Sequence, residues 1–521
     1  MVNKLTILNI KYVMMFLFGL HASTNAVAQV KYPLAVEKVL KLTPKNRHQL
    51  EKVIAHYQKT GETLKLKATY FLISNMDIHS SYDIIWVDAN QQKVPFNELD
   101  YPNMEAATAT FEKLKKQFKG VHPKQIIYRD IDRITANYLI DNIDKAFIAW
   151  KSPYAKNLNF SDFCEYLLPY RISVEPLQNW RGRYQNEFKD FLNGEKGKPL
   201  ESLLTDLAIK RPELFYNSFG DEQVRRKEPL PRLGALNLLL RKNGSCEDMA
   251  GLAVFSLRAM GVASSIDYVP YWATSAYSHF FNVAFKPNKT VVPFEMGNAN
   301  NPLQVIPLRR EPSKVIRTTY SKQAGTLASF TALEEIPSGF LRSQNYLDVT
   351  SDYWETADLP VRLQSGIPNG KIVYACVFNN GQFKATWWAK ASAGIANFEK
   401  MPKGVVYLPM VYQNKKTVVC GNPVALGYHN KLELNADLSK PRSIVVKQQD
   451  NYLLFKSGKK YRLYYWKNGW KLSSAQTAMT NEGQLIFTNV PNNALLILIP
   501  EYSKHKERPF IITDKGERVW F

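Results

Sequence analysis

Cysteine is scarce in this chain: its 521 residues include four, namely Cys164, Cys246, Cys376 and Cys420. They are widely spaced and form no Cys-x-x-Cys motif, and no two histidines stand at metal-ligand spacing. We therefore expect neither a metal site nor a cofactor. Cys376 and Cys420 fall in one β-rich stretch, and the sequence leaves open whether they pair in a disulfide.

Long apolar runs are also missing beyond the first 28 residues, so we expect no transmembrane segment. The stretch from Met1 to Ala28 carries Lys4 and Lys11, an apolar run over 12–20, and an Ala-x-Ala motif at 26–28. This pattern is typical of a secretory signal peptide, and its apolar run is too short to span a bilayer. We therefore expect an exported protein, periplasmic or extracellular.

Acidic residues are outnumbered: 68 Lys and Arg stand against 46 Asp and Glu, which gives a formal net charge of +22. The basic residues are dispersed in short groups without a nucleic-acid-binding motif, so we expect no nucleic-acid partner and a solvated basic surface. An acidic envelope glycan stays open as a partner. With 45% apolar residues, the chain has enough material for several cores.

The chain is richest in reactive side chains between Gly244 and Glu295. Apolar residues recur at helical spacing behind Cys246, at Met249, Leu252, Ala253, Leu257 and Met260. Ser245 is expected to cap this helix, with Asp248 close to a capping box, and Gly261 to end it. Cys246 then lies in the first helical turn, where the helix dipole and free N–H groups favour a thiolate, while the neighbouring acids oppose it.

The strands predicted after this helix carry a histidine and a carboxylate. We expect strands over 265–272, 279–285 and 290–296, with a Lys-Pro-Asn-Lys turn between the last two. His279 opens the second strand and Glu295 lies near the end of the third, so the hairpin brings their side chains side by side. A carboxylate in that place orients an imidazole ring.

Together these residues predict a nucleophilic cysteine site. With the sheet packed on the helix, Cys246 attacks a carbonyl carbon, His279 takes and returns the proton, and Glu295 holds the ring. Residues of the same strands are candidates for the wall of a substrate cleft, namely Asp267, Tyr268, Trp272 and Asn282. The alternative for each is a structural role, because buried cysteines and strand aromatics often simply pack in a core.

Three motifs carry a resemblance to a known family. Gly-Ser-Cys-Glu-Asp-Met-Ala around Cys246, Ser-His-Phe-Phe-Asn-Val around His279 and Val-Pro-Phe-Glu ending at Glu295 resemble the transglutaminase-like superfamily, in particular its secreted or periplasmic Bacteroidetes forms. The resemblance covers roughly residues 160–325 and implies a papain-type fold with a Cys, His, Asp triad. Glu295 stands where the family usually has Asp, and Phe281 replaces a common Trp.

The whole chain is predicted to be an α+β protein of several parts. After the signal peptide come a helical N-terminal region, 29–150, and a papain-like transglutaminase core, 151–330, in which a helix packs on an antiparallel sheet. Short alternating or apolar segments then predict C-terminal β-sandwich modules in 331–440 and 441–521. Asn379-Asn380-Gly381 is a strong hairpin signal in the first module.

Two functional classes agree with these features. The first is an enzyme that acts on a protein or peptide amide through a Cys246 thioester, with water or an amine as the second nucleophile. Relatives favour hydrolysis, as in a protease or amidase, over crosslinking. The second is a catalytically silent protein of the same fold that binds an envelope protein or glycan through its β-modules.

Overall fold

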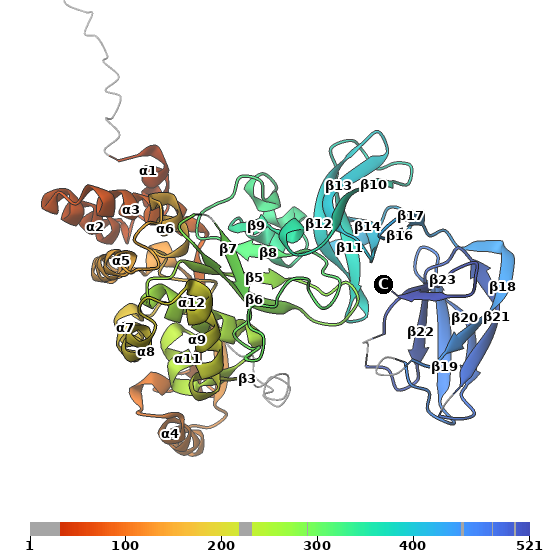
Figure 1. The fold of residues 1–521 in the computed structure, drawn as a ribbon, viewed down its shortest axis with the longest axis horizontal. Coiled ribbons are helices and arrows are strands. Elements are labelled where there is room, and N and C mark those ends of the chain that lie inside the picture. The colour runs from red at the N-terminus through yellow and green to blue at the C-terminus, as the bar shows by residue number, and fades with distance from the viewer. Residues whose placement is uncertain are drawn as a thin grey trace, which may run out of the picture.

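The computed structural model describes residues 32–217, 232–288, 290–449, 453–481, 483–504 and 507–520. The predicted signal peptide lies outside the described residues. Along the long axis of the molecule, N-terminal helices are followed by a mixed core and then by two groups of strands (Figure 1). This combination of helices with several antiparallel sheets agrees with the predicted α+β class.

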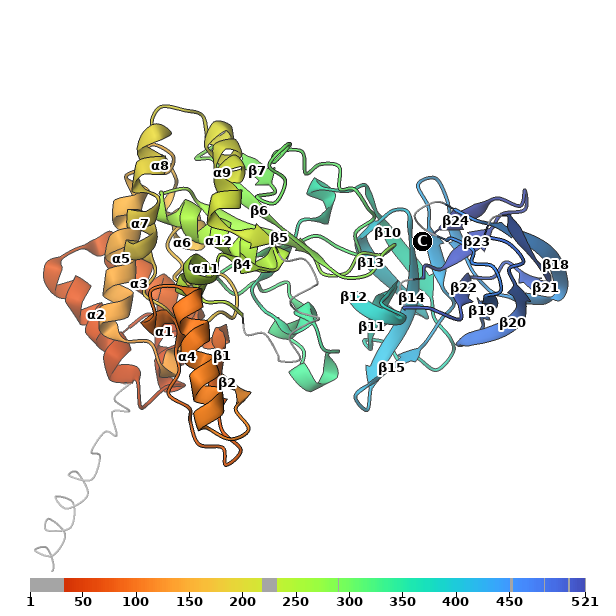
Figure 2. The ribbon, with the colours of Figure 1, turned by 90° about the horizontal axis from the view of Figure 1, so that it is seen from below.

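The N-terminal part is a group of helices around one apolar cluster. Its helices are α1 (Leu34–Lys41), α2 (Arg47–Thr60), α3 (Thr63–Asn75) and α5 (Ala136–Trp150). The apolar stripe of α2 is fully buried, as its helical spacing requires. Figure 2 places these helices at the end of the molecule opposite the last strands.

A two-stranded sheet interrupts the helical region, and the sequence patterns did not predict it. β1 (Ser80–Val87) pairs antiparallel with β2 (His122–Arg129), and α4 (Met104–Gln117) lies in the connection between them. Glu98 of the same connection forms an ion pair with Arg241, 2.6 Å between Oε2 and Nη2. The connection between β1 and β2 therefore contacts the segment that precedes Cys246.

The core packs a long helix, α12 (Cys246–Ala259), on one face of a sheet with the strand order β7-β6-β5-β8-β9. The strands are antiparallel: β5 (Ser264–Val269), β6 (His279–Phe285), β7 (Val291–Phe294), β8 (Ile316–Thr318) and β9 (Tyr346–Asp348). Shorter elements surround α12, namely α6 (Phe160–Tyr166), α7 (Arg181–Glu187), α8 (Lys189–Gly194), α9 (Leu200–Leu214), β3 (Tyr216–Asn217), α11 (Ala235–Arg241) and β4 (Asn243–Gly244). Ile266, Ala284 and Phe294 pack against apolar residues of α12 and fix the sheet on the helix.

The predicted end of α12 is confirmed at Gly261. Gly261 has φ +78, and the N–H of Val262 donates to the carbonyl of Leu257 at 2.8 Å, which is the closing bond of a Schellman motif. A Cβ on Gly261 would also lie 2.3 Å from the carbonyl oxygen of Ala149. Both the backbone conformation and the close packing therefore require glycine at this position.

The first predicted strand of the core is shorter than expected. β5 ends at Val269 and not at Trp272, because Pro270 has no N–H for the strand ladder. Residues 270–278 instead form a loop that leads to the start of β6, and in it the N–H of Trp272 donates to the carbonyl of Tyr277 at 3.1 Å. We call this segment the 270–278 loop.

The next sheet has the order β10-β13-β12-β11-β14-β16-β17, with β15 paired on β14. Its strands are β10 (Thr356–Arg362), β11 (Ile372–Asn379), β12 (Gln382–Ser392), β13 (Ile395–Pro402), β14 (Val405–Gln413), β15 (Lys416–Val419), β16 (Val424–Leu426) and β17 (Lys431–Glu433). Asn380 and Gly381, with φ +50 and +75, form the two-residue turn between β11 and β12. The predicted hairpin is therefore confirmed.

The last part holds two sheets around one apolar cluster. The first pairs β18 (Asp437–Lys447) with β21 (Gln484–Asn492), and the second has the order β20-β19-β22-β23-β24. The strands of the second sheet are β19 (Lys460–Trp466), β20 (Trp470–Thr477), β22 (Leu496–Pro500), β23 (Phe510–Ile512) and β24 (Arg518–Trp520). Cys376 and Cys420, which the sequence left open as a disulfide pair, are both free, buried thiols in different apolar clusters.

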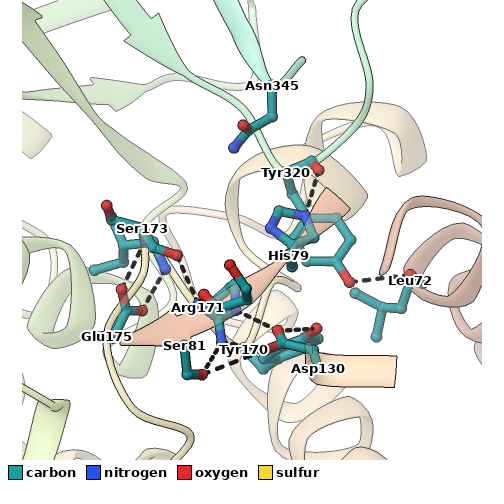
Figure 3. A network of polar contacts seen from close by, with 12 residues as sticks. Leu72, His79, Ser81, Asp130, Tyr170, Arg171, Ser173, Glu175, Tyr320 and Asn345 are labelled. Carbon is teal, nitrogen blue, oxygen red and sulfur yellow. Dashed lines mark hydrogen bonds and ion pairs between the residues drawn. The ribbon is translucent and has the colours of Figure 1, made fainter. Parts of the chain in front are cut away.

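A buried polar network joins the N-terminal part to the core (Figure 3). Arg171 donates from Nη2 and Nε to the two carboxylate oxygens of Asp130 at 2.6 and 2.5 Å, and Tyr170 donates to the same carboxylate at 2.8 Å. His79 donates from Nε2 to the carbonyl of Tyr320 at 2.9 Å, and burial lowers the pKa of His79 to about 3, so its ring is neutral. The network gives the buried charges partners and ties the β1–β2 sheet to the core.

Candidate active site

Cys246 is the first residue of α12, and the sequence around it builds the helix start. Ser245 caps the helix: its Oγ accepts from the N–H of Asp248 at 3.3 Å, while Asp248 Oδ2 accepts from the N–H of Ser245 at 2.9 Å. The predicted capping box is therefore complete. Cys246 is partly exposed and lies at the positive end of the helix dipole.

The two acidic residues that follow Cys246, Glu247 and Asp248, both have interaction partners. Asp248 accepts hydrogen bonds from the backbone and the hydroxyl of Ser245. Glu247 forms an ion pair with Arg232, and burial raises the pKa of its carboxyl although Arg232 opposes the rise. The repulsion that these carboxylates were expected to exert on a thiolate is therefore partly offset. Arg232 was not singled out from the sequence, because the pairing depends on the folded chain.

His279 and Glu295 come together across the β6–β7 hairpin. The register pairs Asn282 with Phe294, so Glu295, just past the end of β7, lies diagonally across from His279, the first residue of β6. Nε2 of the imidazole is 3.3 Å from Oε1 of the carboxylate. The longer Glu side chain thus reaches a ring that is not directly opposite.

The pKa of His279 is raised to about 9. Burial lowers it, but hydrogen bonds with the side chains of Cys246 and Glu295 outweigh this effect. The pKa of Glu295 is lowered, because its hydrogen bond and ion pair with His279 and the nearby charge of Arg309 outweigh burial. His279 is therefore an imidazolium near neutral pH, with the Glu295 carboxylate at Nε2 and the Cys246 side chain as a second hydrogen-bond partner.

Two aromatic rings pack against the histidine. The ring of Trp272 stacks on His279 with centroids 5.8 Å apart and an interplanar angle of 23°, and the ring of Phe281 lies at the same centroid distance. Phe281 is fully buried and in turn contacts Tyr353 edge-on at 5.2 Å. Trp272 is thus the predicted cleft residue that the structure brings to the ring of His279.

The other predicted cleft residues lie elsewhere. Tyr268 and Asn282 pack between the sheet and the body of α12. Tyr268 stacks on Phe280 at 5.1 Å, and Asn282, 1% exposed, donates from Nδ2 to the carbonyl of Ala250 at 2.9 Å. Both residues join the sheet to the helix.

Asp267 is on the same face of the sheet as His279 but is buried in an ion pair of its own. Arg317 donates to its two carboxylate oxygens at 2.9 and 2.8 Å, and Tyr353 donates at 2.5 Å. The Asp267 carboxylate is therefore neutralised by Arg317 inside the core.

Within the described ranges, no group of three or more His, Cys, Asp or Glu side chains is placed to hold a metal ion. In the same part of the chain, none of the helices combines the length and the apolar character needed to cross a membrane.

Comparison with known proteins gives little beyond this geometry. No family model matches the chain, and no curated protein matches it. Among solved structures, the chain is similar to red sea bream transglutaminase, with 9% sequence identity and a TM-score of 0.21, over 84% of this chain and 76% of that one. A likeness of this size carries no weight for the fold or the activity, which therefore have to be argued from the site itself.

Proposed function

We propose that this protein is an exported, transglutaminase-like enzyme that cleaves or transfers the acyl group of a protein or peptide amide through a thioester on Cys246. The observation that supports this proposal is the linked set of Cys246, His279 and Glu295, with the cysteine at a capped helix start. A periplasmic or extracellular site of action follows from the expected signal peptide and belongs to the same proposal.

The chemistry follows from the positions of the three groups. The Cys246 thiolate attacks the amide carbon, a C–S bond forms, and the carbonyl π electrons move to oxygen. When this intermediate collapses, the C–N bond breaks and His279 gives its proton to the leaving amine. Water then attacks the thioester, His279 takes its proton, and the thiolate leaves, which yields the acid and the free enzyme.

The helix start also supplies a donor for the developing oxyanion. The first N–H groups of a helix have no intrahelical acceptor, and that of Cys246 lies beside the attacking sulfur. A bound amine in place of water would complete a transamidation with the same groups. We favour hydrolysis, as a protease or amidase, over crosslinking.

The test is alkylation of the intact protein with iodoacetamide across a pH series. The other three thiols, Cys164, Cys376 and Cys420, are at most 2% exposed, and burial raises the pKa of each, so labelling of the folded protein reports on Cys246. An ordinary thiol of pKa about 8.5 is roughly 3% thiolate at pH 7. We expect wild-type labelling to stay fast down to pH 6 and the Cys246→Ala variant not to label.

Fast labelling justifies a screen of peptide amides for release of amine, with hydroxylamine as a trap for the thioester. A profile that rises only around pH 8.5 would contradict the enzyme proposal. The chain would then have to be treated as a binding protein, and envelope glycans would be the first ligands to measure.

A further inference from the structure

The 270–278 loop sets the position of the histidine, because it ends where β6 begins at His279. Its backbone is not one that the sequence would adopt by itself: Tyr277 has φ +72, a region that non-glycine residues seldom enter. The internal hydrogen bond of the loop joins Trp272 to Tyr277. The ring of Trp272 stacks on His279, and Tyr277 lies two residues before His279 in the chain. Contacts from outside the loop must therefore hold this conformation.

One side chain of the eight-stranded sheet supplies such contacts. Nδ2 of Asn379, the last residue of β11, is 3.0 Å from each of three loop carbonyl oxygens, those of Trp272, Ser275 and Tyr277. Asn379 is only 3% exposed. Because all three partners are acceptors, only the amide nitrogen can face them, and its two N–H groups are shared among three carbonyls.

We propose that Asn379 is a positioning residue for His279, and that the eight-stranded sheet is thereby a working part of the catalytic site. This inference rests on the proposed function. Asn379 fixes the backbone at Trp272, which carries the ring against the imidazole, and at Tyr277, just before the catalytic residue. The first half of the loop is also paired with residues 311–313 of the core, through Tyr271 and Ala273. Loss of the Asn379 contacts therefore acts chiefly on the half that ends at His279.

The eight-stranded sheet contacts the core at further points besides Asn379. Ala273, in the middle of the loop, is buried in the apolar cluster of the eight-stranded sheet. Nearby, the buried Lys314 of the core donates to the carbonyls of Glu399 and Lys400, in β13 of the same sheet, at 3.0 and 2.9 Å, and also binds Asp348 at 2.7 Å. Asn379 therefore acts from a platform that is fixed to the core at a second point.

The experiment compares Asn379→Asp with a matched control in the full-length protein. The Asp side chain has nearly the same shape as Asn, but it lacks the N–H donors and places a carboxylate against three carbonyl oxygens. The control is Asn380→Asp, which makes the same charge change one residue away, at an exposed turn position whose φ of +50 Asp tolerates. The measurements are the pH profile of Cys246 alkylation and the pKa of His279 from NMR titration of its ring.

We expect Asn379→Asp to slow labelling at pH 7 at least tenfold, to move the midpoint of the profile toward about 8.5, and to lower the pKa of His279. At pH 9.5 its rate should approach that of the wild type, whereas a variant that was merely misfolded would differ at every pH. Asn380→Asp should stay within about twofold of the wild type at pH 7.

A wild-type profile for Asn379→Asp would overturn the inference while leaving the proposed function intact. An ordinary thiol profile in the wild type would overturn the proposed function, and the inference with it. If Asn379→Asp does not fold, Asn379→Ala removes the donors without adding a charge, and the same midpoint shift decides the question.

Discussion

Replacement of Glu295 by Gln tests the interaction between its carboxylate and the ring of His279. The two side chains are about one quarter exposed, at 25% for His279 and 27% for Glu295, so solvent screens their 3.3 Å contact only in part. The rise of the pKa of His279 from 6.5 to about 9 is opposed by burial and caused by Cys246 and Glu295 together. A rise of this size corresponds to about 3 kcal/mol in favour of the imidazolium.

If Glu295 supplies about half of that free energy, the Gln variant lowers the pKa of His279 by roughly one unit. NMR titration of the histidine ring measures this shift, and the labelling profile of Cys246 should move in the alkaline direction with it. Glu295→Asp is the matched control, since it keeps the charge but is one methylene shorter. Because Glu295 is diagonal to His279, we expect Asp to give an intermediate pKa. An unchanged pKa of His279 in the Gln variant would refute the assigned role of Glu295.

Three further predictions use other groups. His279→Ala should slow alkylation of Cys246 at pH 7 roughly tenfold to thirtyfold, as measured by mass spectrometry, with equal rates for both proteins well above pH 9. Because the folded pKa of His279 is raised, protonated His279 stabilises the fold below pH 6.5, and this contribution of up to about 3 kcal/mol disappears as the pH rises through about 9. Urea unfolding across that window should show the loss in the wild type and not in His279→Gln. Arg171→Met leaves the buried Asp130 without its positively charged partner and should cost about 3 to 5 kcal/mol in the same assay. Arg129→Met, at an exposed ion pair, should cost less than about 1 kcal/mol.

Local patterns were enough to predict the helix that begins at Cys246 and the hairpin beside it. The cap at Ser245, the stop at Gly261 and the Pro-Asn turn each act within a few residues, so their effects are visible in the sequence. The pairing of His279 with Glu295 follows from that turn. The β1–β2 sheet was missed because its two strands are separated by a helix, and a strand pairing of this kind has no local signal.

The face of a strand residue was harder to assign than its presence in the strand. Tyr268 and Asn282 occur in the predicted strands, but they pack against the body of α12, whereas His279 contacts Cys246 at the start of that helix. β5 and β6 are mostly buried on both faces of the sheet, so alternation of polar and apolar residues does not show which face packs on α12.

Cys246 and His279 are therefore positioned in different ways, the first by local contacts and the second by contacts between residues far apart in the sequence. Cys246 is positioned by a capping box within four residues of itself, so the nucleophile should survive most changes elsewhere in the chain. His279 is positioned by contacts of much longer range, including those of Asn379, which lies 102 to 107 residues from its partners in the 270–278 loop. An isolated core without the eight-stranded sheet would keep the thiol at the helix start and lose the Asn379 contacts that hold the 270–278 loop beside His279. Reactivity of Cys246 therefore reports on whether the sheet and the core are correctly joined.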